Sequence, residues 1–180
     1  GSGWPVPGVE LRTVHGVRLI SDNAGVIAFD LPELMGQETW FTVSGHGYGV
    51  KADGFGYKGT RLRPEPGKKL TVTVERRILA QRLGRLTGTG LFAESHKLGE
   101  HLDWRDGPVV GCDSIVNARF GGKQFWFWGD TNLSNYPLGI FNVSAATTAD
   151  FVPPARPPLK VRFDYFLNQK GAARGVADVP

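Results

Sequence analysis

Short β-prone runs separated by glycine and proline turn signals constrain this chain more than any other feature. The 180 residues include 25 glycines and 12 prolines, and runs rich in Val, Phe, Thr and Trp lie between these breakers. Over residues 5–75 no apolar stripe of 3.6-residue period runs long enough for a helix of about ten residues. The pattern predicts an all-β protein.

The first 77 residues predict a small β-sandwich. Apolar and polar residues alternate in several short runs, and His15-Gly16 is suited to a tight turn between two of them. Alternation of this kind is typical of strands with one buried face. The predicted strands cover 9–14, 17–20, 26–29, 40–43 and 70–74. The side chains expected to point inward are Leu11, Leu19, Ile27, Phe29, Phe41, Val43, Val72 and Val74.

Three motifs in this region resemble those of the transthyretin-like, carboxypeptidase regulatory-type domains. They are Pro5-Val6-Pro7-Gly8-Val9, the turn Ser21-Asp22-Asn23-Ala24-Gly25, and the strand exit Val43-Ser44-Gly45-His46-Gly47-Tyr48. The resemblance covers residues 5–75, with Ser21 where the family usually has threonine and with an insertion over 53–66. It implies a non-catalytic accessory sandwich.

Residues 78–108 are expected to connect this sandwich to a second domain over 109–180. Four strands are predicted there, at 110–120, 123–128, 138–145 and 159–166, and Gly121-Gly122 is a strong hairpin signal between the first two. Four antiparallel strands make one blade of a β-propeller, and a propeller needs at least four blades. The propeller is therefore expected to be incomplete at Pro180, with the remaining blades on a longer or companion chain.

Two aspartates carry the candidate chemistry of the second domain. Asp113 follows Gly111-Cys112, and Asp130 follows Trp128-Gly129. Carboxylates at the ends of apolar strands are costly unless they are paired or used. Asp is also a favoured turn residue, so a purely turn-capping role for both acids stays open.

The two motifs Gly111-Cys112-Asp113 and Phe127-Trp128-Gly129-Asp130-Thr131 resemble the first blade of five-bladed β-propeller glycoside hydrolases. The resemblance implies that Asp113 lines the central channel as a base or nucleophile. Asp130 would accept a sugar hydroxyl or tune the pKa of Asp113. Glycosidases place a second carboxyl group about 5–10 Å from the first, and here it is expected from another blade, so the chain alone is predicted to be inactive. With the accessory sandwich, the resemblance implies a secreted or periplasmic bacterial protein that acts on a polysaccharide.

Trp126 and Trp128 lie on the same strand face as Asp130 under period-two alternation. They are candidates for stacking on a sugar ring, although packing between blades is the commoner fate of such residues. Thr131 and Asn132 complete the predicted substrate-binding set. Trp104, flanked by charged residues, is expected to be exposed.

Other function classes are disfavoured by the sequence. The net charge is only +4, the basic residues are mostly scattered, and the aromatic residues fall in strand-like runs that core packing explains, which argues against nucleic acid binding. No apolar run reaches 18 residues, so no membrane partner is expected. His96 and His101 do not have zinc-ligand spacing, no cofactor is predicted, and the single cysteine, Cys112, is expected to be a small buried hydrophobe.

The rival hypothesis is a non-catalytic module that binds a carbohydrate or assembles with a protein. In that case both aspartates are structural. The two hypotheses differ in whether a second acid lies within about 10 Å of Asp113 in the complete assembly.

Overall fold

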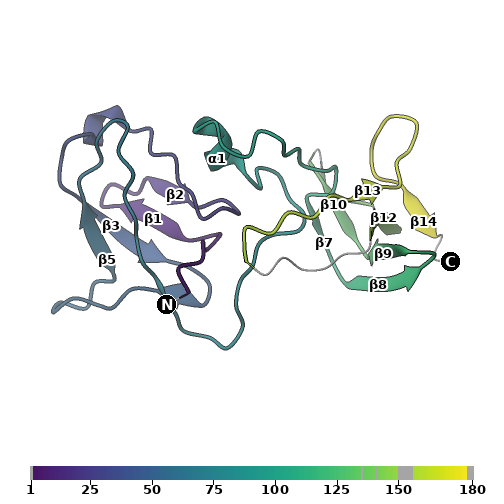
Figure 1. Ribbon diagram of the computed structural model, residues 1–180, viewed down its shortest axis with the longest axis horizontal. Coiled ribbons are helices and arrows are strands. Elements are labelled where there is room, and N and C mark those ends of the chain that lie inside the picture. The colour runs from purple at the N-terminus through teal and green to yellow at the C-terminus, as the bar shows by residue number, and fades with distance from the viewer. Residues whose placement is uncertain (1, 135, 141, 150–155, 178–180) are drawn as a thin grey trace. The chain divides into compact units, whose positions relative to one another are not determined.

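The computed structural model describes residues 2–134, 136–140, 142–149 and 156–177, and it is all-β (Figure 1). The helical elements among the described residues are the 3-10 turn Pro32–Leu34 and the short helix α1, Ala93–Lys97. The chain divides into two compact units, and the segment 78–108 is shared between them. Unit 1 comprises residues 1–84, 92–102 and 156–158, and unit 2 comprises 85–91, 103–155 and 159–180.

Unit 1 is built on a four-stranded antiparallel sheet with the order β2-β1-β3-β5. Its strands are β1 Glu10–Thr13, β2 Arg18–Ile20, β3 Thr39–Ser44 and β5 Gly59–Leu62. A separate pair joins β4, Tyr48–Gly49, to β6, Glu75–Arg76. The predicted turn at His15-Gly16 closes β1 onto β2, because Gly16 has φ +86° and its N–H donates to the Thr13 carbonyl oxygen at 3.0 Å.

The core of unit 1 lies on one face of this sheet. Val9, Leu11, Phe41 and Val43 are buried at its centre, and further apolar side chains pack against them. The inward positions predicted from the sequence are confirmed, since each belongs to this cluster or packs on it. They are Leu11, Leu19, Ile27, Phe29, Phe41, Val43, Val72 and Val74.

Two predicted strands of unit 1 are wrong. Residues 26–29 and 70–74 have no strand assignment. In the first segment the Ala28 N–H donates to the Glu94 carboxylate at 3.0 Å rather than to a neighbouring strand. In the second, the alternation of half-buried Val72 and Val74 reflects their packing on the core.

A buried carboxylate holds the turn after β2. Asp22 accepts the Ala24 N–H at 2.9 Å and the Val26 N–H at 3.2 Å through Oδ1, as Asp commonly does in a turn. Its Oδ2 accepts the Ser95 N–H of α1 at 2.7 Å. One side chain therefore fixes the turn and anchors α1 to the sheet of unit 1.

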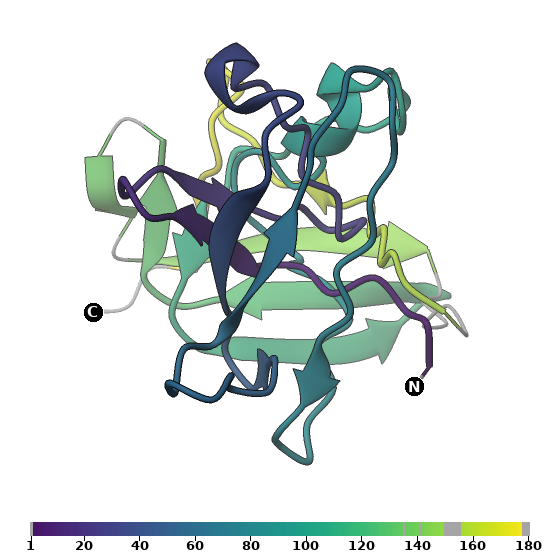
Figure 2. The same ribbon diagram turned by 90° about the vertical axis from the view of Figure 1, so that its left-hand side faces the viewer.

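Unit 2 is built on an antiparallel sheet in which β13, β12, β9 and β8 are successive neighbours and β14 also pairs with β12. Figure 2 shows the long strands of this sheet side by side in green. The hairpin predicted at Gly121-Gly122 is confirmed: it joins β8 to β9, and both glycines have positive φ, as a two-residue turn between strands requires. The strands are β8 Ile115–Phe120, β9 Lys123–Trp128, β12 Val143–Ala149, β13 Asp164–Tyr165 and β14 Gly175–Ala177.

The other predicted strands of unit 2 require correction. The run 110–120 is broken at Ser114, which has φ +42°, into β7, Gly111–Cys112, and β8. Residues 138–145 belong to two strands, β11 Tyr136–Ile140 and β12, with Phe141 outside the described residues. Of 159–166, β13 alone is a strand. Strand β10, Thr131–Leu133, pairs with β7 and β11 in a separate three-stranded sheet.

One face of the larger sheet carries the core of unit 2. Trp126, Trp128 and Ala146 are buried there, with Leu86, Cys112, Phe163 and Tyr165 packed against them. The ring of Phe163 meets both indoles edge-on, at centroid distances of 5.5 and 5.3 Å.

The opposite face of this sheet carries the residues that alternate with these tryptophans along β9. Phe125 and Phe127 lie there, half-buried, with their rings stacked at 6.4 Å. Within the described part of the chain, no helix is long and apolar enough to cross a bilayer.

Candidate functional site

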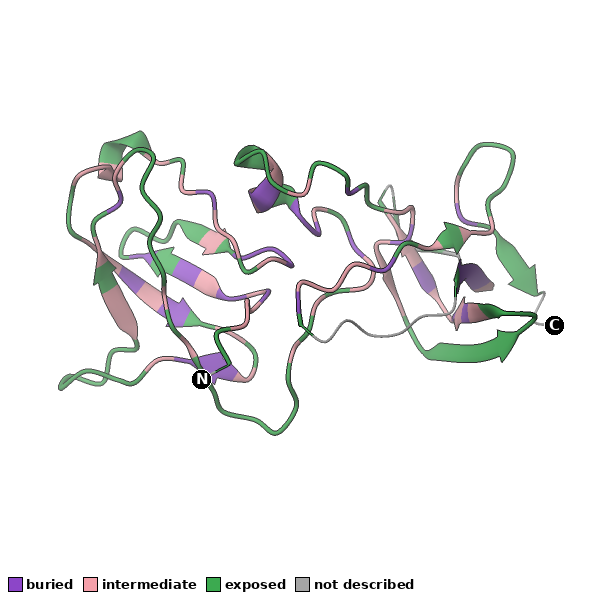
Figure 3. Cartoon of the chain, in the orientation of Figure 1, coloured by how far each residue is buried: buried purple, intermediate pink, exposed green. Residues whose placement is uncertain are grey.

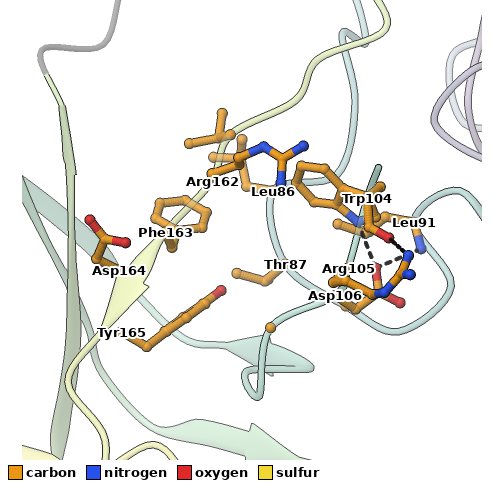
Figure 4. Close-up of a pocket in the computed structure, with 13 residues that line it drawn as sticks. Leu86, Thr87, Leu91, Trp104, Arg105, Asp106, Arg162, Phe163, Asp164 and Tyr165 are labelled. Atoms are coloured by element: carbon orange, nitrogen blue, oxygen red, sulfur yellow. Dashed lines mark hydrogen bonds between the residues drawn. The ribbon is translucent and has the colours of Figure 1, made fainter. Parts of the chain in front are cut away.

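A pocket of about 380 Å³ lies within unit 2 (Figure 4). Three segments that are distant in sequence form its walls, and the volume is in the range of small-molecule sites, about 300–1,000 Å³. The lining residues of the first segment are Leu86, Thr87, Gly88 and Leu91; of the second, Trp104, Arg105, Asp106 and Gly107; of the third, Val161, Arg162, Phe163, Asp164 and Tyr165.

Asp106 ties the first two walls together. Its Oδ2 accepts the Gly90 N–H at 2.6 Å, and its Oδ1 accepts the Leu91 N–H at 3.3 Å and the Trp104 indole N–H at 2.9 Å. Hydrogen bonds from three N–H donors fix the orientation of this carboxylate. Asp106 therefore acts as a rigid clamp that positions the Trp104 ring.

Trp104 is 4% exposed, so the expectation of an exposed indole is wrong. The Arg162 guanidinium lies over its ring at 5.7 Å, and Arg162 Nη2 donates to Asp103 Oδ2 at 2.7 Å. Lys160 Nζ donates to Asp103 Oδ1 at 2.9 Å, and this pairing lowers the pKa of Asp103. The sequence neighbour Asp103 thus holds Arg162, and Arg162 covers the indole.

Tyr165 forms the facing wall, with its hydroxyl directed toward Thr87 in Figure 4. Burial of the phenol, together with the Cys112 thiol and the Asp106 carboxylate, raises the pKa of Tyr165 to about 12. Its hydroxyl is therefore protonated at neutral pH and can both donate and accept a hydrogen bond. Burial also raises the pKa of Cys112, which stays a thiol.

The two sequence-predicted acids come together at main-chain level, outside the pocket lining. The Asp113 N–H donates to the Asp130 carbonyl oxygen at 2.9 Å, and the Gly129 N–H donates back to the Asp113 carbonyl oxygen at 2.9 Å. Asp113 is exposed and Asp130 is half-buried. The Asp113 carboxylate accepts the Ser114 N–H at 2.7 Å, which is the turn-capping contact that the sequence left open.

The four residues predicted to bind substrate mainly take part in packing and in internal hydrogen bonds. Trp126 and Trp128 are core residues, and the Trp126 indole N–H donates to Thr148 Oγ1 at 3.0 Å. Thr131 is fully buried: its hydroxyl donates to the Gly129 carbonyl oxygen at 2.8 Å and lies 2.6 Å from Ser144 Oγ. Asn132 is half-buried in β10, where its main-chain carbonyl oxygen accepts the Val110 N–H at 3.0 Å.

Sequence reasoning missed the pocket because no local motif marks it. Trp104 and Tyr165 are 61 positions apart (165 minus 104), and nothing in either segment predicts that they face one cavity. One local feature could have pointed to the site: Asp106 lies two residues after Trp104, where its carboxylate can accept the indole N–H. Among the described residues, no group of three His, Cys, Asp or Glu side chains is arranged to hold a metal ion.

The fold and site define an all-β protein of two units whose second unit contains a ring-lined pocket. Comparison with protein-family models, with curated proteins and with solved structures finds no match to this chain.

Proposed function

We propose that unit 2 is a carbohydrate-binding module whose site is the pocket between Trp104 and Tyr165. The observation that carries this proposal is the combination of aromatic walls with fixed polar groups in a cavity of about 380 Å³. Saccharides present both C–H faces, which pack on aromatic rings, and hydroxyl groups, which need donors and acceptors. Phe163 and Tyr165 offer the rings, and the Tyr165 and Thr87 hydroxyls offer hydrogen bonds.

The charge balance of the pocket favours a neutral ligand. Arg162 is paired with Asp103, Arg105 Nη1 donates to the Trp104 carbonyl oxygen at 2.7 Å, and Asp106 accepts three N–H groups. The lining carries two arginines and two aspartates, Arg105, Arg162, Asp106 and Asp164, so its formal charges balance and a strongly anionic ligand gains no net attraction. A neutral glycan suits this balance.

Affinity electrophoresis tests the proposal. The chain is run in native gels that contain soluble xylan, β-glucan, galactomannan or arabinan, and retardation relative to a gel without polysaccharide reports binding. We expect retardation by at least one of these polymers. Tyr165→Phe keeps the ring and removes the hydroxyl, so it should weaken binding by about three- to tenfold, the value of one hydrogen bond.

The matched control is Tyr57→Phe, because Tyr57 is an exposed tyrosine of unit 1. This variant should be retarded as strongly as the unchanged chain. Retardation by none of the polymers, or equal retardation of the Tyr165→Phe variant, would contradict the proposal.

A second candidate function is glycoside hydrolysis at Asp113, within an assembly that supplies another acid. The main-chain pairing of Asp113 with Asp130 favours it, since it holds the two acidic residues on neighbouring segments. Asp113→Asn should then lower the rate of glycan cleavage by at least about 10²-fold. Reducing-sugar release by the complete assembly measures this rate, and an unchanged rate would exclude Asp113 from catalysis.

A further inference from the structure

The outer edge of β8 is the most conspicuous surface that the proposed carbohydrate site does not use. The sheet order places β8 at the end, paired with β9 on one side and with no other described strand. All six residues from Ile115 to Phe120 are exposed (Figure 3). Long, flat, exposed edge strands are templates for pairing with another strand unless charge, proline or a bulge blocks them.

Strand β8 has few of these protections. It contains no proline, its pairing with β9 runs without a bulge over six residues, and its one charged residue is Arg119. Val116 and Phe120 are 64% and 78% exposed. Their side chains lie on the same face as Phe125 and Phe127, because Val116 is opposite Phe127 in the ladder.

The register of the hairpin defines which main-chain groups face outward. Phe120 and Lys123 close the two-residue turn, so Phe120, Ala118 and Val116 exchange hydrogen bonds with β9. The N–H and C=O groups of Asn117 and Arg119 then point to the outer edge. These groups can bond a strand that lies antiparallel to β8.

We propose that this strand is β8 of a second copy of the chain, paired antiparallel about a twofold axis at Ala118. In this register Val116 lies opposite Phe120 of the partner on the apolar face. On the other face Arg119 lies opposite Asn117, so no like charges oppose each other. The small Ala118 meets its own copy at the axis, which is the isologous arrangement of twofold dimers.

The pairing extends the sheet of unit 2 across both copies, and the two apolar faces lie side by side on the same side of the continuous sheet. It is independent of the carbohydrate site, because none of the pocket-lining residues lies in β8. A two-strand interface is small, so the association is expected to be weak, at about micromolar to millimolar Kd.

Sedimentation equilibrium over a concentration series to about 1 mM tests the pairing. The weight-average mass of the 180-residue chain should rise above the monomer mass as the concentration increases. Val116→Lys should raise the dimer Kd by about tenfold or more, because each dimer loses two apolar cross-strand pairs between position 116 and Phe120 and an added charge protects an edge strand from pairing. Val14→Lys is the matched control, since Val14 is 76% exposed in unit 1, and it should leave the Kd unchanged.

Disulfide trapping tests the register. In a Cys112→Ser background, Ala118→Cys places two thiols opposite each other at a non-hydrogen-bonded pair, about 4.5 Å apart at Cα, within reach of a disulfide. Oxidised glutathione should convert it to a covalent dimer. Ile115→Cys is the control, because the two copies of residue 115 are far apart in this register. A monomer at all concentrations, a dimer unaffected by Val116→Lys, or equal trapping through Ile115→Cys would overturn the proposal.

Discussion

Gly107 lies directly against the ring of Tyr165, so closely that a methyl group at position 107 would be 2.3 Å from Tyr165 Cε2. The absence of a side chain at this position lets the tyrosine ring stand as one wall of the pocket. This contact offers a way to change the shape of the cavity without removing a hydrogen-bonding group.

Gly107→Ala should displace the Tyr165 ring and weaken carbohydrate binding. One added methyl group in a binding pocket typically changes affinity by about 10- to 200-fold, and we expect a loss in this range by titration calorimetry. Gly111→Ala is the control in unit 2, because its new methyl group would be no closer than 3.4 Å to Asn132. Equal affinities of the two variants would show that the ring position does not shape the site.

Tyr165 should be recognisable in an alkaline titration. Its pKa is raised to about 12 from an ordinary value of 10.0, because the phenol is buried and acidic groups lie nearby. The folded state holds the proton more tightly than the unfolded state, so this group's contribution to stability is complete below about pH 10 and is lost between about pH 10 and 12. Near-ultraviolet absorbance should show a phenol ionising near pH 12.

The Tyr165→Phe variant should lack that transition and should lose less stability over the same pH interval in urea unfolding. Persistence of the late transition in this variant would assign it to another of the four tyrosines.

The sequence was sufficient to predict the parts of the fold that depend on local patterns. Alternation identified β1 and β3, and the glycine pair identified the β8–β9 hairpin. It overpredicted strands at 26–29, where Glu94, far along the chain, takes the N–H that a ladder would use. Apolar alternation reports a buried face, and it does not reveal whether the main chain pairs with a neighbouring strand.

The candidate site depended on long-range contacts and was less accessible to sequence reasoning. Tryptophan is a residue type that commonly stacks on sugar rings, but Trp128 packs against Phe163 in the core. Trp104 has charged neighbours typical of the surface, yet Arg162, 58 positions later (162 minus 104), covers it. Whether a tryptophan is buried depends on which distant segment packs on it, and the residues beside it in the sequence do not identify that segment.

Gly59→Ala should destabilise unit 1. A methyl group at position 59 would lie 2.4 Å from the Phe41 carbonyl oxygen and 2.5 Å from the Trp40 ring, so β3 and β5 would have to separate. Overpacking of this kind costs about 1–3 kcal/mol, which urea unfolding monitored by tryptophan fluorescence can measure. Gly54→Ala is the control, since its methyl group would have no neighbour within 4 Å; equal stability of both variants would contradict the tight β3–β5 contact.

Thr148→Val should destabilise unit 2. The Thr148 hydroxyl accepts the indole N–H of Trp126 at 3.0 Å in the core, and valine has a similar shape without an acceptor. Loss of a partner for a buried donor costs about 1–3 kcal/mol. Thr148→Ser keeps the hydroxyl and should retain more stability than Thr148→Val in thermal unfolding, and the reverse order would mean that this hydrogen bond is not important for unit 2.

The most direct test of the carbohydrate-binding proposal is amide NMR of the isotopically labelled chain during titration with an oligosaccharide from the polymer that retards it most. We predict that the perturbed amides cluster in residues 86–91, 104–107 and 161–165, which form the pocket. The amides of β1 and β3 in unit 1 should stay unperturbed. Perturbations confined to unit 1, or to the exposed turn at Asp113, would contradict the assignment of the site.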